Sequence, residues 1–132
     1  MLRAQERFLG KKTMGIISKP ELINAARLFS RIEEHLLGDN KPSSALKEMI
    51  KTHDFESYPF SMLKKLELTP QSPMHHPEGN VWNHTLMVVD EAAQRRQESS
   101  DPRAFMWAAL LHDIGKPATT RSRKGRITAY DH

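Results

Sequence analysis

Residues 102–117 read PRAFMWAALLHDIGKP, and this stretch determines how the rest of the chain is interpreted. Asp101 directly before a proline is a typical start of a helix, and the run is almost entirely apolar until the glycine and second proline that should end it. A helix that is apolar on most sides is normally buried. We therefore expect a buried helix with His112 and Asp113 at its carboxyl end.

The adjacent His112 and Asp113 are the main candidates for chemistry. A buried carboxylate without a partner costs several kcal/mol or takes up a proton, and a metal ion is one partner that removes this cost. Adjacent helical residues point about 100° apart, so another element must help close a ligand shell. His84, on the preceding predicted helix, is the obvious third ligand. Alternatively, the pair is only a helix cap and a surface charge, favoured there by the helix dipole.

Apolar residues at helical spacing predict further helices before this stretch. Ser18 and Glu21 form a capping box that begins the first of them. Its apolar stripe consists of Leu22, Ala25, Ala26, Phe29, Ile32 and Leu36. The predicted helices span about residues 19–37, 44–52, 58–67 and 80–97. We expect the charged end of the last one, with Arg95 and Arg96, to lie in solvent.

The intervening segments predict loops and set the domain bounds. Residues 69–79, TPQSPMHHPEG, contain three prolines and a glycine and should form an ordered loop. Residues 118–129 are polar and basic, which predicts a surface loop before a new element near Tyr130. Residues 1–17 lack a clean period and are interpreted as an arm, so the helical domain is 18–132. Without two-residue alternation, the predicted fold class is all-α, a bundle of five or six helices.

Composition narrows the kinds of site and partner. The chain has no cysteine, so a metal site must use imidazole and carboxylate groups. Its net charge of +4 favours phosphate-bearing partners. No apolar run approaches the roughly eighteen residues of a membrane span, and no signal peptide is evident, so a cytoplasmic location without membrane contact is expected. The sequence leaves self-association as a homo-oligomer open.

A family resemblance rests on three strings: HTLMVVDEA at 84–92, AALLHDIGKPATT at 108–120 and GRITAYDH at 125–132. Over about residues 76–132 the chain resembles the HD superfamily of metal-dependent phosphohydrolases. The resemblance implies an HD-type helical bundle that holds one or two divalent ions, commonly Mg, Mn, Fe, Ni or Zn. Carried over by position, the ligands are His84, His112 and Asp113, with His132 serving a second ion. The family's later aspartate has no match, so the resemblance implies a domain that is incomplete at its carboxyl end.

Residues 69–90, TPQSPMHHPEGNVWNHTLMVVD, also resemble the HD region of bacterial CCA-adding tRNA nucleotidyltransferases. In those enzymes this region follows the polymerase part. The nucleotidyltransferase domain, with paired acidic residues on strands, has no counterpart in this sequence. Addition of nucleotides to tRNA is therefore not predicted for this chain.

The ligand set and the resemblance together predict hydrolysis of a phosphomonoester or phosphodiester, of a nucleotide, another phosphorylated small molecule or an RNA end. A divalent ion with open positions polarises a phosphoryl oxygen and activates water. Asp113 would orient the water and Lys116 would stabilise developing charge, unless Lys116 is simply an exposed residue near a helix end. Candidate substrate contacts are Lys116, Arg121, Arg123, Arg126 and His76.

Several of these residues also have a purely structural interpretation. The pattern of the arginines favours a solvated loop over a nucleic-acid contact, because no aromatic side chain for base stacking is interleaved among them. His76 could instead anchor its own loop. The alternative function is a catalytically incomplete HD module with a regulatory role or a role in protein or RNA interaction.

Overall fold

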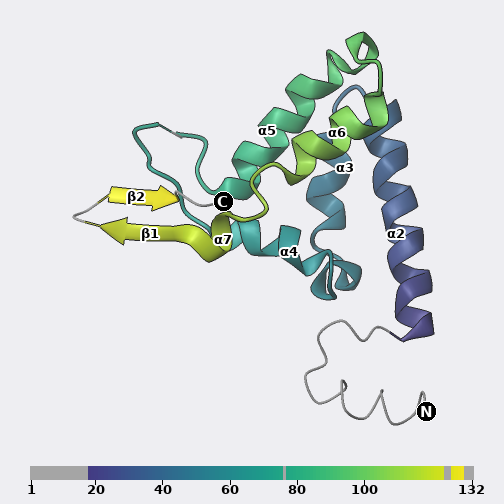
Figure 1. The fold of residues 1–132 in the computed structure, drawn as a ribbon, viewed down its shortest axis with the longest axis horizontal. Helices are drawn as coiled ribbons and strands as arrows, with labels where there is room; N and C mark the ends of the chain where they lie inside the picture. Colours follow the sequence, from purple (N-terminus) through teal and green to yellow (C-terminus); the bar gives the residue numbers. More distant parts are fainter. Residues whose placement is uncertain (1–17, 76, 124–125, 130–132) are drawn as a thin grey trace.

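The computed structural model describes residues 18–75, 77–123 and 126–129 of the chain (Figure 1). Its helices are α2 (Lys19–Gly38), α3 (Pro42–Met49), α4 (Ser61–Lys64), α5 (Val81–Ala93), α6 (Pro102–Leu111) and α7 (Lys116–Thr119). Short 3-10 helices are η1 (His53–Glu56), η2 (Lys65–Leu68) and η3 (Arg96–Glu98). The predicted all-α bundle is confirmed, and no described helix is long and apolar enough to cross a membrane. The predicted arm at 1–17 and the element near Tyr130 lie outside the described residues.

Helices α5 and α6 lie side by side, and their facing sides form the centre of the core (Figure 1). Helices α2 and α3 complete it from the other side. Burying each large apolar side chain contributes about 1.5–3 kcal/mol, so this shared core fixes the two helices that carry the candidate ligands. The fully buried side chains at its centre include Ile32, Leu36, Leu46, Val81, Val89, Met106 and Leu110.

Helix α6 is less buried than its composition predicts. Only Met106 and Leu110 are buried, whereas Phe105 and Leu111 are each 37% exposed. The prediction of a helix buried on most sides is therefore wrong. Its neighbours α2 and α5 cover one face of α6 and leave the opposite face open within the described residues.

Helix α2 has the predicted bounds, and its start is capped as expected. The Ser18 hydroxyl oxygen accepts a hydrogen bond from the backbone N–H of Glu21. The predicted stripe is only half right, because Ile32 and Leu36 are buried but Leu22 is 55% exposed. The packed side of α2 follows the line through Leu28, one position away from the sequence prediction.

The carboxylate of Glu33 links α2 to α6. One oxygen of Glu33 accepts hydrogen bonds from the Trp107 indole N–H at 2.9 Å and from Arg103 Nε at 2.6 Å. The Trp107 ring also stacks on Phe29 with centroids 4.3 Å apart. The bond from Trp107, then that from Arg103, holds the pKa of Glu33 below its ordinary value of 4.5.

This shift predicts how stability depends on pH. A carboxylate with a lowered pKa in the folded state stabilises the fold above its unfolded pKa and loses that contribution as the pH falls through the folded value. We expect Glu33→Gln to be less stable than the parent at pH 7 and to lose this difference at acidic pH, below the ordinary value of 4.5. Urea unfolding of both proteins at several pH values measures this. A difference that stays constant across the range would contradict it.

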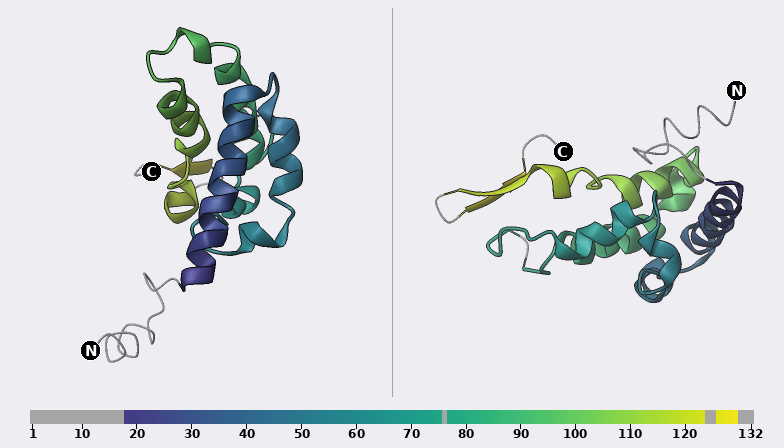
Figure 2. Two further views of the ribbon diagram at one scale, coloured as in Figure 1. Left: turned by 90° about the vertical axis from the view of Figure 1, so that its right-hand side faces the viewer. Right: turned by 90° about the horizontal axis from the view of Figure 1, so that it is seen from below.

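The segment 118–129, predicted as a loop, forms the end of α7 and a two-stranded hairpin. Strand β1 (Thr120–Arg123) pairs antiparallel with β2 (Arg126–Ala129), with Thr120 opposite Ala129 and Arg123 opposite Arg126. In the sequence, two residues including a glycine separate two short stretches that contain β-branched residues. This pattern is typical of a hairpin, and the loop prediction did not take it into account. The hairpin and the loop before α5 extend from the same end of the helical body (Figures 1 and 2).

The remaining boundaries differ modestly from the predicted ones. Helix α3 begins at Pro42, two residues early, and the predicted helix at 58–67 is divided between α4 and η2. Helix α5 ends at Ala93, and the chain turns into η3. Arg96, predicted to lie in solvent, is only 8% exposed, so that prediction is wrong.

Candidate metal centre

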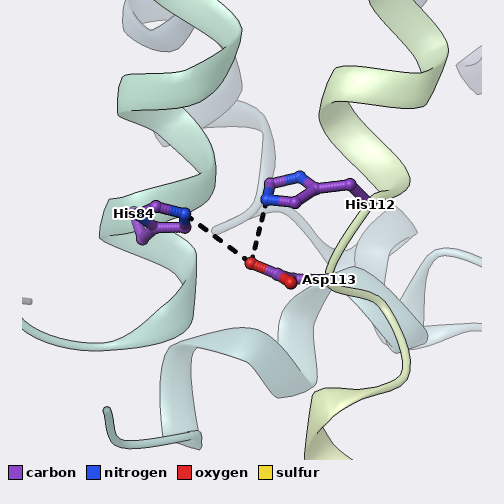
Figure 3. Close-up of side chains that lie close together, drawn as sticks. All are labelled: His84, His112 and Asp113. Atoms are coloured by element: carbon purple, nitrogen blue, oxygen red, sulfur yellow. Dashed lines mark ion pairs between the residues drawn. The ribbon is translucent and has the colours of Figure 1, made fainter. Parts of the chain in front are cut away.

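Three side chains from the α5 and α6 segments converge at one point (Figure 3). His84 lies in the first turns of α5, His112 is the C-cap of α6, and Asp113 follows it. One ligand atom from each lies within 4.8 Å of the others. Asp113 Oδ2 is 2.9 Å from His112 Nε2 and 3.7 Å from His84 Nε2. The structure thus brings together the three candidate ligands that the sequence suggested.

The three clustered side chains differ in their exposure to solvent. The Asp113 side chain is 5% exposed, whereas His84 is 23% and His112 36% exposed. The carboxylate therefore forms the floor of the site and His112 its edge. A charge held near Asp113 is poorly screened by water, which strengthens its interaction with a cation.

The end of α6 fixes the orientation of His112. Its Nδ1 lies 2.8 Å from the carbonyl oxygen of Ala109. The last carbonyls of a helix have no amide partner within the helix, and a carbonyl oxygen can only accept. His112 therefore carries a proton on Nδ1, and in the neutral ring the lone pair is on Nε2, which faces Asp113.

His84 is held in the same way by a different group. Its Nδ1 is 2.8 Å from Oε2 of Glu78, in the loop before α5. An ionised carboxylate only accepts hydrogen bonds, so Nδ1 is the donor and Nε2 again carries the lone pair of the neutral ring. Both imidazoles thus present toward Asp113 a nitrogen whose lone pair could bind a metal ion.

This geometry fits a divalent cation. Two imidazole lone pairs directed at one carboxylate oxygen repel it unless a positive charge, either a proton or an ion, lies between them. Metal-to-ligand distances of about 2.0–2.2 Å in a tetrahedral site place two ligand atoms roughly 3.4 Å apart. The distances from Asp113 Oδ2 to the two Nε2 atoms, 2.9 Å and 3.7 Å, lie on either side of that value. Imidazole with carboxylate suits Zn, Fe, Ni or Mn.

Lys116, the first residue of α7, also reaches the carboxylate. Its Nζ is 3.4 Å from Asp113 Oδ2 and donates a hydrogen bond to Gln71 Oε1 at 2.8 Å. Only 14% of the Lys116 side chain is exposed. The alternative of a freely exposed lysine is therefore wrong.

Sequence reasoning missed two neighbours of the site. Glu78 lies in the predicted loop 69–79 and has no periodic signal, and its position six residues before a candidate ligand is the only indication that the sequence offers. Gln71 is buried beside Lys116, and a glutamine in a proline-rich loop gave no signal.

The other predicted contacts lie where the structure describes the backbone alone or does not describe the residue. Arg121 and Arg123 lie on β1 and Arg126 on β2, and their register places all three at positions of one face of the hairpin. His76 and His132 lie outside the described residues. His75, the residue before His76 in the same loop, is exposed.

One known protein family matches the part of the chain that holds the site. The sequence model of the HD domain family matches residues 81–130. The multifunctional CCA protein of Actinobacillus pleuropneumoniae serotype 5b (strain L20) is 39% identical over 62 residues, covering 47% of this chain and 15% of that protein. That of Methylococcus capsulatus (strain Bath) is 47% identical over 60 residues, covering 46% and 13%.

A third relative, the multifunctional CCA protein of Aromatoleum aromaticum, is 50% identical over 50 residues, covering 38% of this chain and 11% of that protein. The match therefore spans only a small part of each of these relatives. No solved structure matches the chain significantly. Residues 81–130, with His84, His112 and Asp113 among them, match the HD domain family, and the chain has partial homology to multifunctional CCA proteins.

Proposed function

We propose that this chain is a divalent-metal-dependent phosphohydrolase whose ion is held by His84, His112 and Asp113. HD domains are typically metal-dependent phosphohydrolases. The observation that carries the proposal is the approach of two oriented imidazole nitrogens and one buried carboxylate oxygen to within 4.8 Å. Each nitrogen is the one left without a proton by the hydrogen bond on the other side of its ring.

The chemistry follows from these groups. A bound divalent ion supplies Lewis acidity, which polarises a phosphoryl oxygen and makes water a better nucleophile. Asp113 orients the attacking water by accepting its hydrogen bond. Lys116, held beside the same carboxylate, offsets negative charge that develops on the phosphoryl and leaving oxygens. Both residues are therefore proposed as catalytic.

The proposed substrate is a phosphomonoester or phosphodiester of a nucleotide or an RNA end. The net charge of +4 favours anionic substrates, and Arg121, Arg123 and Arg126 share one face of a projecting hairpin. The match to the HD domain family and the similarity to proteins named multifunctional CCA proteins together support nucleotide or RNA substrates in general. His76 is proposed as a further substrate contact and His132 as a ligand of a second ion.

The proposal is tested on the purified full chain. We expect bound or readily loaded divalent metal and hydrolysis of p-nitrophenyl phosphate or bis(p-nitrophenyl) phosphate that a chelator abolishes. His112→Ala should lose both metal and activity, whereas His53→Ala, at a histidine that is 92% exposed, should keep both. A wild-type protein that binds no Mn²⁺, Zn²⁺, Ni²⁺ or Fe²⁺ would overturn the proposal.

A second candidate, an interaction or regulatory module without metal, is supported by one observation. The Lys116 ammonium, 3.4 Å from Asp113 Oδ2, already supplies a positive charge to the buried carboxylate. An HD module could balance its charge in this way without an ion. Retention of the folded state with no gain in thermal stability on adding metal would favour this candidate over the hydrolase.

Removing the charge of Lys116 should change metal affinity and kcat in opposite directions. Because its ammonium competes with an ion for Asp113, Lys116→Met should raise the affinity for Mn²⁺ severalfold. The same change should lower kcat by roughly 10- to 100-fold, since one charge-stabilising donor is lost. Metal titration followed by steady-state kinetics at saturating metal measures both. A parallel loss of affinity and kcat would instead identify Lys116 as part of the scaffold of the site.

A further inference from the structure

Glu78 lies next to the candidate metal centre without being one of its three clustered ligands. Its Oε2 is 2.8 Å from Nδ1 of His84, on the side of the ring that faces away from Asp113. The side chain of Glu78 is 14% exposed, less than that of His84 at 23%. A carboxylate that is largely removed from water is costly to maintain unless it is paired, and Glu78 is paired with a candidate ligand.

The chain holds Glu78 in place through several local contacts. Asn83 Nδ2 donates to the carbonyl oxygen of Glu78 at 3.1 Å. Gly79 follows with φ of 112°, a left-handed conformation that L side chains rarely adopt. Asn80 Nδ2 donates to the Glu67 carbonyl at 2.8 Å while its Oδ1 caps α5. The carboxylate is thus anchored to the same helix start that carries His84.

The hydrogen bond decides which nitrogen of His84 is available to a metal. A neutral imidazole carries one proton, and the nitrogen without it binds metal. Without an acceptor at Nδ1, the proton could move to Nε2, where Asp113 Oδ2 lies 3.7 Å away and would attract it. Glu78 and Asp113 thus compete for the proton of His84, and the shorter distance of 2.8 Å favours Glu78.

The site orients its second histidine without a carboxylate. His112 obtains the same tautomer from the Ala109 carbonyl, a neutral acceptor supplied by the end of α6. His84 lies near the start of α5, where free amide groups, and not carbonyls, are available. An acceptor for His84 must therefore come from outside its helix, and Glu78 provides it.

We propose that Glu78 is a positioning residue of the metal centre, which keeps the proton of His84 on Nδ1 and so directs the Nε2 lone pair to the ion. The inference rests on the proposed function, because it assumes that His84 binds metal. Partners of this kind around metal-bound histidines affect metal affinity by about 10- to 100-fold.

The test compares Glu78→Ala and Glu78→Gln with Glu91→Gln, a matched control at an exposed glutamate of α5. Two-bond ¹H–¹⁵N spectra of the metal-free proteins at about pH 8, where histidine side chains are ordinarily neutral, report the tautomer of His84. We expect the Nδ1–H form in the parent, in the control and in Glu78→Gln, whose amide oxygen still accepts. Glu78→Ala should show the Nε2–H form or a mixture.

Metal titration supplies the second readout. We expect Glu78→Ala to bind Mn²⁺ or Zn²⁺ about 10- to 100-fold more weakly, with Glu78→Gln recovering part of the loss and the control unchanged. The inference would be overturned if Glu78→Ala kept the tautomer of the parent. This includes the case in which both Glu78 variants lose metal affinity equally. A parent that binds neither ion would overturn the metal centre itself. In that case the spectra still decide whether Glu78 sets the tautomer of His84.

Discussion

Replacing Asp113 with asparagine should weaken the binding of Mn²⁺ or Zn²⁺ by more than about 100-fold, which exceeds the usual effect of residues that only orient ligands. Asp113 Oδ2 is the atom that both imidazoles approach, and its side chain is 5% exposed. Asparagine preserves the shape of the side chain but removes the negative charge that an ion would neutralise. Calorimetric titration, or competition with a coloured chelator, measures the affinity directly.

The matched control is Asp54→Asn, at an exposed aspartate of η1. It should bind metal as the parent does, and both variants should keep the helical circular dichroism of the parent. Phosphohydrolase activity should fall with Asp113→Asn and stay unchanged in the control. If Asp113→Asn bound metal with the affinity of the parent, Asp113 would have to be removed from the proposed ligand set.

The three clustered residues could be named from the sequence because their chemistry is local. His112 and Asp113 are adjacent at a predicted helix end, and His84 lies on the next helix back in the chain. The groups around them could not be named in this way. Glu78 and Gln71 reach the site through the path of the loop before α5, and a loop path depends on long-range contacts that have no periodic signal.

The helices were predictable for a similar reason, whereas their burial was not. Apolar spacing and capping residues specify where α2 begins, since the Ser18 cap depends on neighbouring residues alone. Which side of α2 or α6 is covered depends on the partners that pack against it. The exposure of Leu22 and Phe105 therefore follows from the arrangement of the bundle and not from the spacing of the residues themselves.

Arg96 is the clearest case in which tertiary structure overrides a local expectation. Charged residues at the end of an amphipathic helix normally lie in solvent, but Arg96 is 8% exposed. Its Nη1 donates to the carbonyl oxygens of Leu36 at 3.2 Å and Asp39 at 2.7 Å. These carbonyls lie at the end of α2, which has a partial negative charge and lacks donors of its own. Arg96 therefore closes α2 from a segment 57 residues away in the chain.

Arg96→Ala should destabilise the fold by about 2–4 kcal/mol, because a charged donor bonded to two carbonyls is removed and those carbonyls are left without this partner. Arg95→Ala, at the exposed neighbouring residue, should change stability by less than about 0.5 kcal/mol. Arg96→Met keeps much of the apolar stem and should recover only the packing part of the loss. Urea unfolding followed by circular dichroism measures all three. Equal unfolding midpoints for Arg95→Ala and Arg96→Ala would mean that the buried guanidinium contributes nothing beyond an ordinary surface charge.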